Sequence, residues 1–420
     1  MKFRHYFKPR YLKFNLIFVM LAVLIGLVSV FFVKVVELAF KVFLYLEPLL
    51  GWWLVVYIPL MMMGIVYLLR RFFPEAEGSG MPQALAISHL DAPQMDKIFM
   101  LRAIFSKILL IFLGTLCGGT LGREGATVQI GASLMNLLGK NLSLQRRKVM
   151  LIVGAASGLA SAFNTPIGGI VFAFEELVKS RRLKFSLLKM TAIAISGIVS
   201  IGLLSNYSYF GRVDRELLYF KDSIFFAAIV IGIAAGGISV IFARIVRFFM
   251  LDKSPLVSWR KNNPYKNALY CGVIVAVVGL LSHGLSFGNG YHESKMALSG
   301  EIVLPPSYVF YKLLSALFTT NSGIPGGYFA TSLAIGNGIG GLVHSLWSIA
   351  NPQQYYLLGM VAFLASLTRA PATAIMMVIQ VSSSQIFSLP LIVAALVATL
   401  FANLFGSGIY EYQINKYVNS

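Results

Sequence analysis

Charged side chains are scarce in this sequence: they make up 12% of the 420 residues, and only 16 of them are Asp or Glu. Soluble globular proteins carry about twice that share of charge, roughly 25%. Hydrophobic residues account for 57% of the chain, and the mean hydropathy is +0.77. The composition therefore excludes a soluble domain and predicts an integral membrane protein.

Cysteine and histidine are also rare, with two cysteines and five histidines in the chain. Cys117 and Cys271 both lie in apolar runs, so we predict buried free thiols and no disulfide. The histidines are scattered and show no spacing typical of a metal site. The sequence therefore predicts neither a metal nor a cofactor.

Long apolar runs dominate what is present, and each is long enough to cross a hydrocarbon core of ~30 Å as a helix. Shorter apolar pieces, broken by glycine and proline, lie between them. We expect an all-α, multi-pass membrane protein whose long runs occupy 15–45, 51–69, 98–118, 186–204, 224–248, 267–283 and 388–405.

The formal net charge of +19 comes from lysines and arginines that cluster at the ends of the apolar runs. This is the positive-inside pattern, so we predict that these clusters and the N-terminus face the cytoplasm and that nucleic acid is not a partner. The basic start precedes about 30 apolar residues without a small-residue cleavage site and is expected to be a retained first helix. The clusters are Lys2, Arg4, Lys8, Arg10 and Lys13; Arg70 and Arg71; Arg146, Arg147 and Lys148; Lys179, Arg181, Arg182 and Lys184; and Arg260, Lys261 and Lys266.

The chain contains a weak internal repeat with a displacement of about 205 residues. "SAFNTPIGGIVFAFEEL" at 161–177 is similar to "ASLTRAPATAIMMVIQV" at 365–381, and in each a proline introduces an apolar helix. "GREGATVQIGASL" at 122–134 is similar to "GGYFATSLAIGNGI" at 326–339. In membrane transporters, such repeats place a binding site at the interface between two halves.

Glycine-rich turns interrupt the apolar sequence in both halves, which we expect to span about 15–205 and 220–415. A turn that runs straight into a helix leaves the first N–H groups of that helix unpaired, and lipid cannot satisfy them. An anion can, because a helix N-terminus carries a partial positive charge. The four interruptions are "EGSGMPQAL" (77–85), "GREGATVQIG" (122–131), "SGIPGGYFATS" (322–332) and "FGSGIYEYQ" (405–413).

Close helix packing is the alternative role for the glycines, because G-x-x-x-G spacing marks helix contacts in membranes. For each glycine taken singly, packing is the favoured interpretation. The repetition of the interruptions in both halves instead favours an anion site. The spacing occurs at Gly114/Gly118, Gly118/Gly122, Gly154/Gly158 and Gly232/Gly236.

The four interruptions resemble, in order, motifs of the CLC family of chloride channels and proton-coupled chloride transporters. "GSGMP" is similar to the family's GSGIP, "GREGATVQIG" to GREGPTVQIG, "SGIPGGYFAT" to its G-x-F-x-P segment, and "GIYEYQI" to its final tyrosine-bearing helix. The resemblance spans nearly the whole chain, without the CBS domains of many eukaryotic members. It implies one transmembrane domain over 1–420 with two inverted halves of tilted and broken helices, and a homodimer in the cell (inner) membrane with one pore in each subunit.

The resemblance also implies a central chloride site at the helix starts. Ser79 would donate its hydroxyl, Tyr410 a second hydroxyl, and Tyr328 and Phe329 their backbone N–H groups. Taken alone, Ser79 is typical of a helix N-cap and Tyr410 of a tyrosine at the membrane interface, so these alternatives stay open. Tyr412 competes with Tyr410 for the same place in the motif.

Glu124 lies between glycines in "GREGAT". At membrane depth, burial of an isolated carboxylate costs on the order of several kcal/mol of free energy unless the group is paired, protonated or hydrated. One interpretation is a structural salt bridge to the adjacent Arg123. The other is that ionised Glu124 occupies an anion position itself and leaves it on protonation, as the matching glutamate of the family does. The second interpretation makes Glu124 both the gate and the extracellular proton acceptor.

Glu175 and Glu176 end an apolar helix beside a basic cluster, where acids are typically interfacial charges. Glu176 matches the internal proton glutamate of CLC antiporters, and this resemblance implies an intracellular proton acceptor in an exchanger of chloride for protons. A passive chloride channel is the first alternative. An intramembrane enzyme is a remote one, since the sequence shows neither a nucleophile with a base nor a metal cluster.

Two positions depart from the family pattern: Ala126 replaces the proline after GREG, and Thr331 replaces the proline of G-x-F-x-P. Both lie at expected helix starts, where proline would pre-set φ and lacks an N–H group. The departures leave the anion preference and the rigidity of the site open, but not the architecture.

Overall fold

The computed structural model describes residues 9–177, 186–204, 209–211, 213–251 and 254–418. Within these ranges the regular structure is helical, apart from one isolated β-bridge. The predicted all-α class is therefore confirmed. Several residues of the predicted basic clusters lie outside the described ranges: Lys2, Arg4, Lys8, Lys179, Arg181, Arg182 and Lys184.

Long helices form where the apolar runs predict them. Five helical stretches of the described chain are long and apolar enough to cross a membrane: Phe14–Phe72, Ala92–Leu116, Ile224–Met250, Pro264–Leu281 and Gln385–Asn403. The helices that match the seven predicted runs are α1 (Pro9–Leu50), α2 (Leu54–Phe72), α5 (Leu101–Leu116), α9 (Leu187–Leu203), α10 (Ile224–Leu251), α12 (Pro264–Leu281) and α18 (Ser388–Asn403).

Further helices fill the space between these spans, and several are too short to cross a membrane alone. They are α3 (Met81–Leu85), α4 (Ala92–Ile98), α6 (Glu124–Gly139), α7 (Leu144–Phe163), α8 (Pro166–Phe172), α11 (Pro255–Asn262), α13 (Tyr291–Ser299), α14 (Tyr308–Ser322), α15 (Phe329–Leu346), α16 (Pro352–Thr368), α17 (Pro371–Ser382) and α19 (Ile409–Val418).

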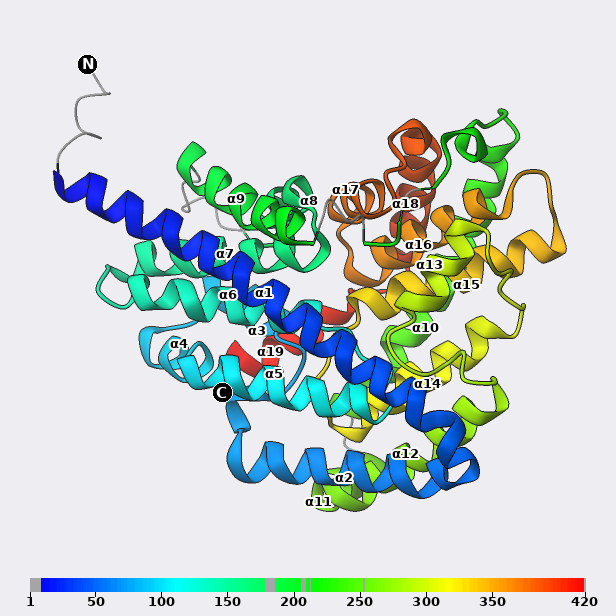
Figure 1. The fold of residues 1–420 in the computed structure, drawn as a ribbon, viewed down its shortest axis with the longest axis horizontal. Helices are drawn as coiled ribbons and strands as arrows, with labels where there is room; N and C mark the ends of the chain where they lie inside the picture. Colours follow the sequence, from blue (N-terminus) through cyan, green and yellow to red (C-terminus); the bar gives the residue numbers. More distant parts are fainter. Residues whose placement is uncertain (1–8, 178–185, 205–208, 212, 252–253, 419–420) are drawn as a thin grey trace.

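The helix contacts of the first half recur in the second. Helix α6 packs on α7 as α15 packs on α16, α7 packs on α8 as α16 packs on α17, and α1 packs on α9 as α10 packs on α18. In Figure 1 the group α6 to α9 lies on one side of the molecule and the group α15 to α18 on the other. Equivalent helices also meet between the halves, where α2 packs on α12 and α8 on α17.

The local backbone repeats as well. Asn164 ends α7 with φ of 58°, and Arg369 ends α16 with φ of 63°, so both helices stop with a residue in the left-handed region. Two residues later, Pro166 and Pro371 begin α8 and α17. The sequence similarity between these two segments therefore reflects the same helix-break-helix structure, and the predicted repeat is confirmed there.

The two halves run in opposite directions where they meet. Gly122 and Gly327, which directly precede the starts of α6 and α15, form an antiparallel bridge. The N–H of each glycine donates to the carbonyl of the other, and both N···O distances are 2.9 Å. This reciprocal pair relates equivalent residues of the two repeats, as an inverted arrangement requires.

Close helix packing explains some of the G-x-x-x-G glycines. A Cβ added at Gly154 or Gly158 of α7 would lie 2.3 Å or 2.1 Å from a backbone oxygen of α6, so the packing interpretation is confirmed for this pair. Gly118 lies in the turn after α5 with φ of 73°, and a Cβ there would lie 2.4 Å from the ring of Phe43 on α1. This glycine therefore supplies a left-handed backbone conformation and also leaves room for a side chain of α1.

Gly154→Ala is expected to destabilise the protein, because the added methyl group would collide with the backbone of α6. Overpacking of this kind costs typically ~1–3 kcal/mol. The thermal unfolding midpoint of the detergent-solubilised protein should fall by several degrees. The matched control is Gly64→Ala in α2, where a Cβ meets no atom within 4 Å. Equal losses in both variants would contradict the packing account.

Candidate functional site

The site forms where the starts of α3, α6 and α15 meet. A Cβ at Gly80 would lie 2.1 Å from the carbonyl oxygen of Gly125, and a Cβ at Gly125 would lie 2.5 Å from the carbonyl oxygen of Ser79. The loop before α3 therefore touches the first turn of α6 backbone to backbone. Larger residues would separate these two segments, and this explains Gly80 and Gly125.

Ser79 is buried between Gly78 and Gly80, whose φ values are 77° and 98°. Its Oγ accepts a hydrogen bond from the N–H of Met81 at 3.3 Å. A hydroxyl that accepts one hydrogen bond still has its own hydrogen to donate. The N-cap of α3 is Gly80, so the N-cap interpretation of Ser79 is wrong. Ser79 contacts the first residue of α3 from one position earlier, and its hydroxyl can also donate to a ligand.

The Glu124 carboxylate lies between the starts of the two inverted helices, and its side chain is fully buried. Its Oε1 accepts a hydrogen bond from the Tyr209 hydroxyl at 3.2 Å, and its Oε2 accepts one from the N–H of Ala330 at 3.4 Å. Ala330 is the second residue of α15. The carboxylate of one half thus binds the helix start of the other half, where an anion is electrostatically favoured.

Glycine at position 122 makes this geometry possible, since a Cβ there would lie 2.4 Å from Oε2 of Glu124. Arg123 lies beside the carboxylate but binds elsewhere. Its guanidinium Nη1 is 3.2 Å from the carbonyl of Val33 and 3.8 Å from the carboxylate of Glu37, both on α1. Among the ion pairs of the described residues, Arg123 is joined to Glu37, and this geometry weighs against the predicted alternative of an Arg123–Glu124 salt bridge.

Tyr328 and Phe329 occupy the start of α15, as the N-cap and the first helical residue. The ring of Tyr328 lies 6.4 Å from that of Tyr410, which is buried at the start of α19. Tyr412 is half-buried instead, with the guanidinium of Arg247 4.0 Å from its ring centre. Of the two competing tyrosines, Tyr410 is therefore the one beside the helix starts.

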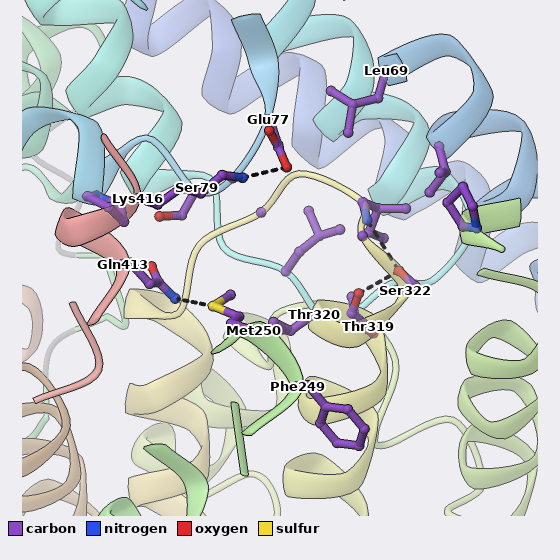
Figure 2. A pocket seen from close by; sticks show the side chains of 18 of the residues that line it. Leu69, Glu77, Ser79, Phe249, Met250, Thr319, Thr320, Ser322, Gln413 and Lys416 are labelled. Carbon is purple, nitrogen blue, oxygen red and sulfur yellow. Dashed lines mark hydrogen bonds and ion pairs between the residues drawn. The ribbon is translucent and has the colours of Figure 1, made fainter. Parts of the chain in front are cut away.

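A cavity of about 780 Å³ reaches this region and is shown in Figure 2. Ser79, Tyr328 and Gln413 line it, and the amide of Gln413 donates to the Tyr328 hydroxyl at 3.4 Å. Cationic side chains outnumber acidic ones along its wall, which attracts anions. The charged lining residues are Arg70, Arg260, Lys261, Lys416 and Glu77.

Lys107 is a component of the site that sequence analysis missed. It lies on α5 with a fully buried side chain, and its Nζ donates to the carbonyl of Gly78 at 2.6 Å. The sequence around this lysine does not indicate its partner, which lies 29 residues away in the chain. Here its hydrogen bond holds the loop that presents Ser79.

Glu176 is buried in a π-helical turn at Ala173–Leu177, next to residues outside the described ranges. Its neighbour Glu175 accepts hydrogen bonds from the N–H groups of Ala372 at 2.9 Å and Thr373 at 2.6 Å. These N–H groups lie in the first turn of α17. Glu175, which was predicted to be an interfacial charge, therefore also caps a helix of the other half with its carboxylate.

The two positions that depart from the family pattern both lie in first helical turns. Ala126 is buried in α6, and Thr331 is buried in α15. Cys117 and Cys271 are buried free thiols, as predicted. Among the described residues, no group of three or more His, Cys, Asp or Glu side chains could hold a metal ion.

Comparison with known proteins agrees with this geometry. Residues 60–403 match the model of a family described as voltage gated chloride channel. The chain is 30% identical to the H(+)/Cl(-) exchange transporter ClcA of Yersinia pestis bv. Antiqua (strain Angola) over 364 residues, which are 83% of this chain and 74% of that protein. It is also 30% identical to ClcA of Salmonella arizonae over 370 residues, covering 81% of this chain and 73% of the relative.

Two solved structures share the fold. A slow cyanobacterial Cl-/H+ antiporter superposes with a TM-score of 0.80 at 22% identity, covering 96% of this chain and 97% of the other. A CLC-type fluoride/proton antiporter superposes with a TM-score of 0.80 at 23% identity, covering 97% and 99%. The match over most of the length, the inverted halves and the joined helix starts lead to one conclusion: the chain belongs to the voltage-gated chloride channel family, the CLC family.

Proposed function

We propose that this protein exchanges chloride for protons across the cell membrane. The observation that carries the proposal is the buried Glu124 carboxylate, held against the start of α15 by the N–H of Ala330. An ionised carboxylate and a chloride ion need the same partners, namely backbone N–H groups at a helix start. They therefore compete for one place. The relatives named as H(+)/Cl(-) exchange transporters support this function.

Protonation of Glu124 is the step that couples the two ions. A neutral acid no longer attracts the helix-start N–H groups as a charge does, so the side chain yields its place to an incoming anion. Ser79, Tyr410 and the backbone N–H groups of Tyr328 and Phe329 would hold that anion next to the cavity. The proton that displaces Glu124 is then carried while chloride moves the opposite way.

Glu176 would receive the proton from the intracellular side. Its support is its burial in the turn after α8, next to Glu175, whose carboxylate caps α17 of the other half. A passive chloride channel is the alternative function, since it would need Glu124 as a gate but not Glu176 as a carrier. An enzymatic activity has no support among the described residues, although the relatives do not exclude one.

The proposal extends to the assembly. We propose one transmembrane domain over 1–420, with halves of about 15–205 and 220–415 that place the site at their interface. The N-terminus and the basic loops would face the cytoplasm, the protein would lie in the inner membrane in contact with lipid, and two copies would form a homodimer with one pore each.

Glu124→Gln is expected to separate chloride flux from proton flux. Glutamine keeps the size of the side chain and resembles the protonated acid, so the anion position should stay open and no proton should be carried. In vesicles, chloride flux should persist while proton movement driven by a chloride gradient falls to background. A well-folded variant that still moves protons would defeat the gate hypothesis.

The matched control for this variant is Glu37→Gln, which removes the ion-pair partner of Arg123 without touching the site. It should lower stability and leave the coupling of the two fluxes intact. If Glu37→Gln uncouples the fluxes as Glu124→Gln does, the charge balance around Arg123 and not the gate is responsible.

Glu176→Gln should preserve chloride flux and reduce proton flux, because it removes a titratable group from the proposed intracellular proton path. Both fluxes are measured in the same vesicle preparation. Glu411→Gln, a change at an exposed carboxylate of α19, serves as the control and should alter neither flux. Equal loss of both fluxes in Glu176→Gln would mean that the residue is structural.

Ser79→Ala should weaken or re-rank anion binding without unfolding the protein. The loss of one hydroxyl donor is worth about 0.5–1.5 kcal/mol, or roughly a factor of two to ten in affinity. Competition between chloride and nitrate in calorimetric titrations measures this change. Ser322→Ala, which alters the same cavity at another wall, should leave the preference unchanged. An unchanged preference in Ser79→Ala would remove this hydroxyl from the site.

A further inference from the structure

The segment that joins the two halves supplies a hydroxyl group to the gate. Tyr209 lies between α9 and α10, outside both repeats, yet its side chain is 1% exposed and its hydroxyl donates to Oε1 of Glu124 at 3.2 Å. The other carboxylate oxygen accepts the N–H of Ala330. The carboxylate is therefore held from two sides, by the start of α15 and by the connecting segment.

Two described residues of the connecting segment, Phe210 and Val213, are bonded to the second half. The N–H of Phe210 donates to the carbonyl of Val381 at 3.0 Å, and the N–H of Val213 donates to the carbonyl of Ser382 at 3.3 Å. Both acceptors lie in the last turn of α17. The backbone beside Tyr209 is thus attached to a helix end and does not depend on Glu124 for its position.

Aromatic rings from both halves hold the side chain of Tyr209. Its ring centre lies 5.0 Å from that of Phe163 at the end of α7 and 4.9 Å from that of Tyr291 at the start of α13, both in edge-to-face geometry. The ring of Phe210 lies 4.8 Å away on the same segment. This surrounding set of rings directs the hydroxyl at the carboxylate, since a buried tyrosine ring packed on several sides has little freedom to turn.

The other polar groups near Glu124 determine how much the Tyr209 hydroxyl can affect the charge of the carboxylate. The guanidinium of Arg123 lies 5.5 Å from the ring centre of Tyr209 and is paired with Glu37 on α1, while Tyr410 of α19 lies beside Tyr328, the N-cap of α15. Among these groups, Tyr209 is the one whose side chain donates a hydrogen bond to the carboxylate. A donor stabilises the ionised carboxylate more than the neutral acid.

We propose that Tyr209 is a positioning residue that holds ionised Glu124 in the pore and sets the pH at which the gate is released. The inference rests on the proposed role of Glu124 as a gate. It adds that the connection between the repeats, and not an element of either repeat, adjusts the gate. Because the hydroxyl favours the ionised and closed form, the gate opens at a higher proton concentration than the helix start alone would require.

Tyr209→Phe tests this directly, because it removes the hydroxyl and keeps the ring. Chloride and proton fluxes are recorded in vesicles over a range of pH. Without the donor, Glu124 is protonated at a lower proton concentration, so the curve of transport against pH should shift to more alkaline pH by about one unit, the tenfold change that one charge-assisted hydrogen bond is worth. A folded variant with an unshifted curve would overturn the proposal.

A substitution that strengthens the hydrogen bond, where Tyr209→Phe removes it, provides a second test if Tyr209→Phe folds poorly. Replacement of Tyr209 by 3-fluorotyrosine retains the ring and makes the phenol a stronger donor. The curve should then shift to more acidic pH. A shift to alkaline pH, or no shift, would count against the proposal.

Two further variants test whether the lost hydrogen bond to Glu124 causes the shift in pH dependence. Tyr291→Phe removes a hydroxyl from the same group of rings and should leave the curve in place, whereas a shift equal to that of Tyr209→Phe would show that packing is responsible. In a Glu124→Gln background, Tyr209→Phe should have no further effect on pH dependence. If the Glu124→Gln protein still moves protons, the proposed function fails. If Glu124→Gln uncouples chloride flux from proton flux but Tyr209→Phe leaves the curve of transport against pH unshifted, only the Tyr209 proposal fails.

Discussion

The first N–H groups of α6 and α15 have no partner within their helices, and the rest of the site follows from the need to satisfy them away from water. Gly122 and Gly327 bring the two helix starts together by donating to each other's carbonyls. That pairing leaves the next N–H groups facing one small region between the halves. The fold thus concentrates partial positive charge at one place in an apolar protein.

A carboxylate is the form of anion that the chain itself can supply to that place. Glu124 reaches across the bridge to the N–H of Ala330, and glycine at 122 leaves room for its carboxylate. The cationic side chains of the cavity wall extend the same electrostatic preference toward the site of anion entry. Because a carboxylate loses its charge when it binds a proton, the site has two states, one with Glu124 bound at the helix starts and one with Glu124 released. A group whose charge cannot change would give one state only.

The sequence predicted the features that depend on residues close together in the chain. Glycine and proline marked the helix starts, so Ser79, Glu124 and Phe329 could be placed at them, and the similarity around Pro166 and Pro371 indicated equivalent breaks in the two halves. Partners distant in the chain left no local signal. Arg123 pairs with Glu37 of α1, Glu175 caps α17, and Tyr209 reaches Glu124 from a connecting segment. A tyrosine after a membrane helix is ordinarily an interfacial residue, so its sequence context indicated no role at the gate.

The central claim is that the movement of chloride drives the movement of protons, and the unaltered protein in sealed vesicles tests it most directly. A chloride gradient is imposed with equal pH on both sides, and the internal pH is recorded. The account predicts that protons move opposite to chloride and build a pH difference against their own gradient. Chloride flux that leaves the internal pH unchanged, with the membrane potential clamped, would contradict exchange and identify the protein as a passive anion channel.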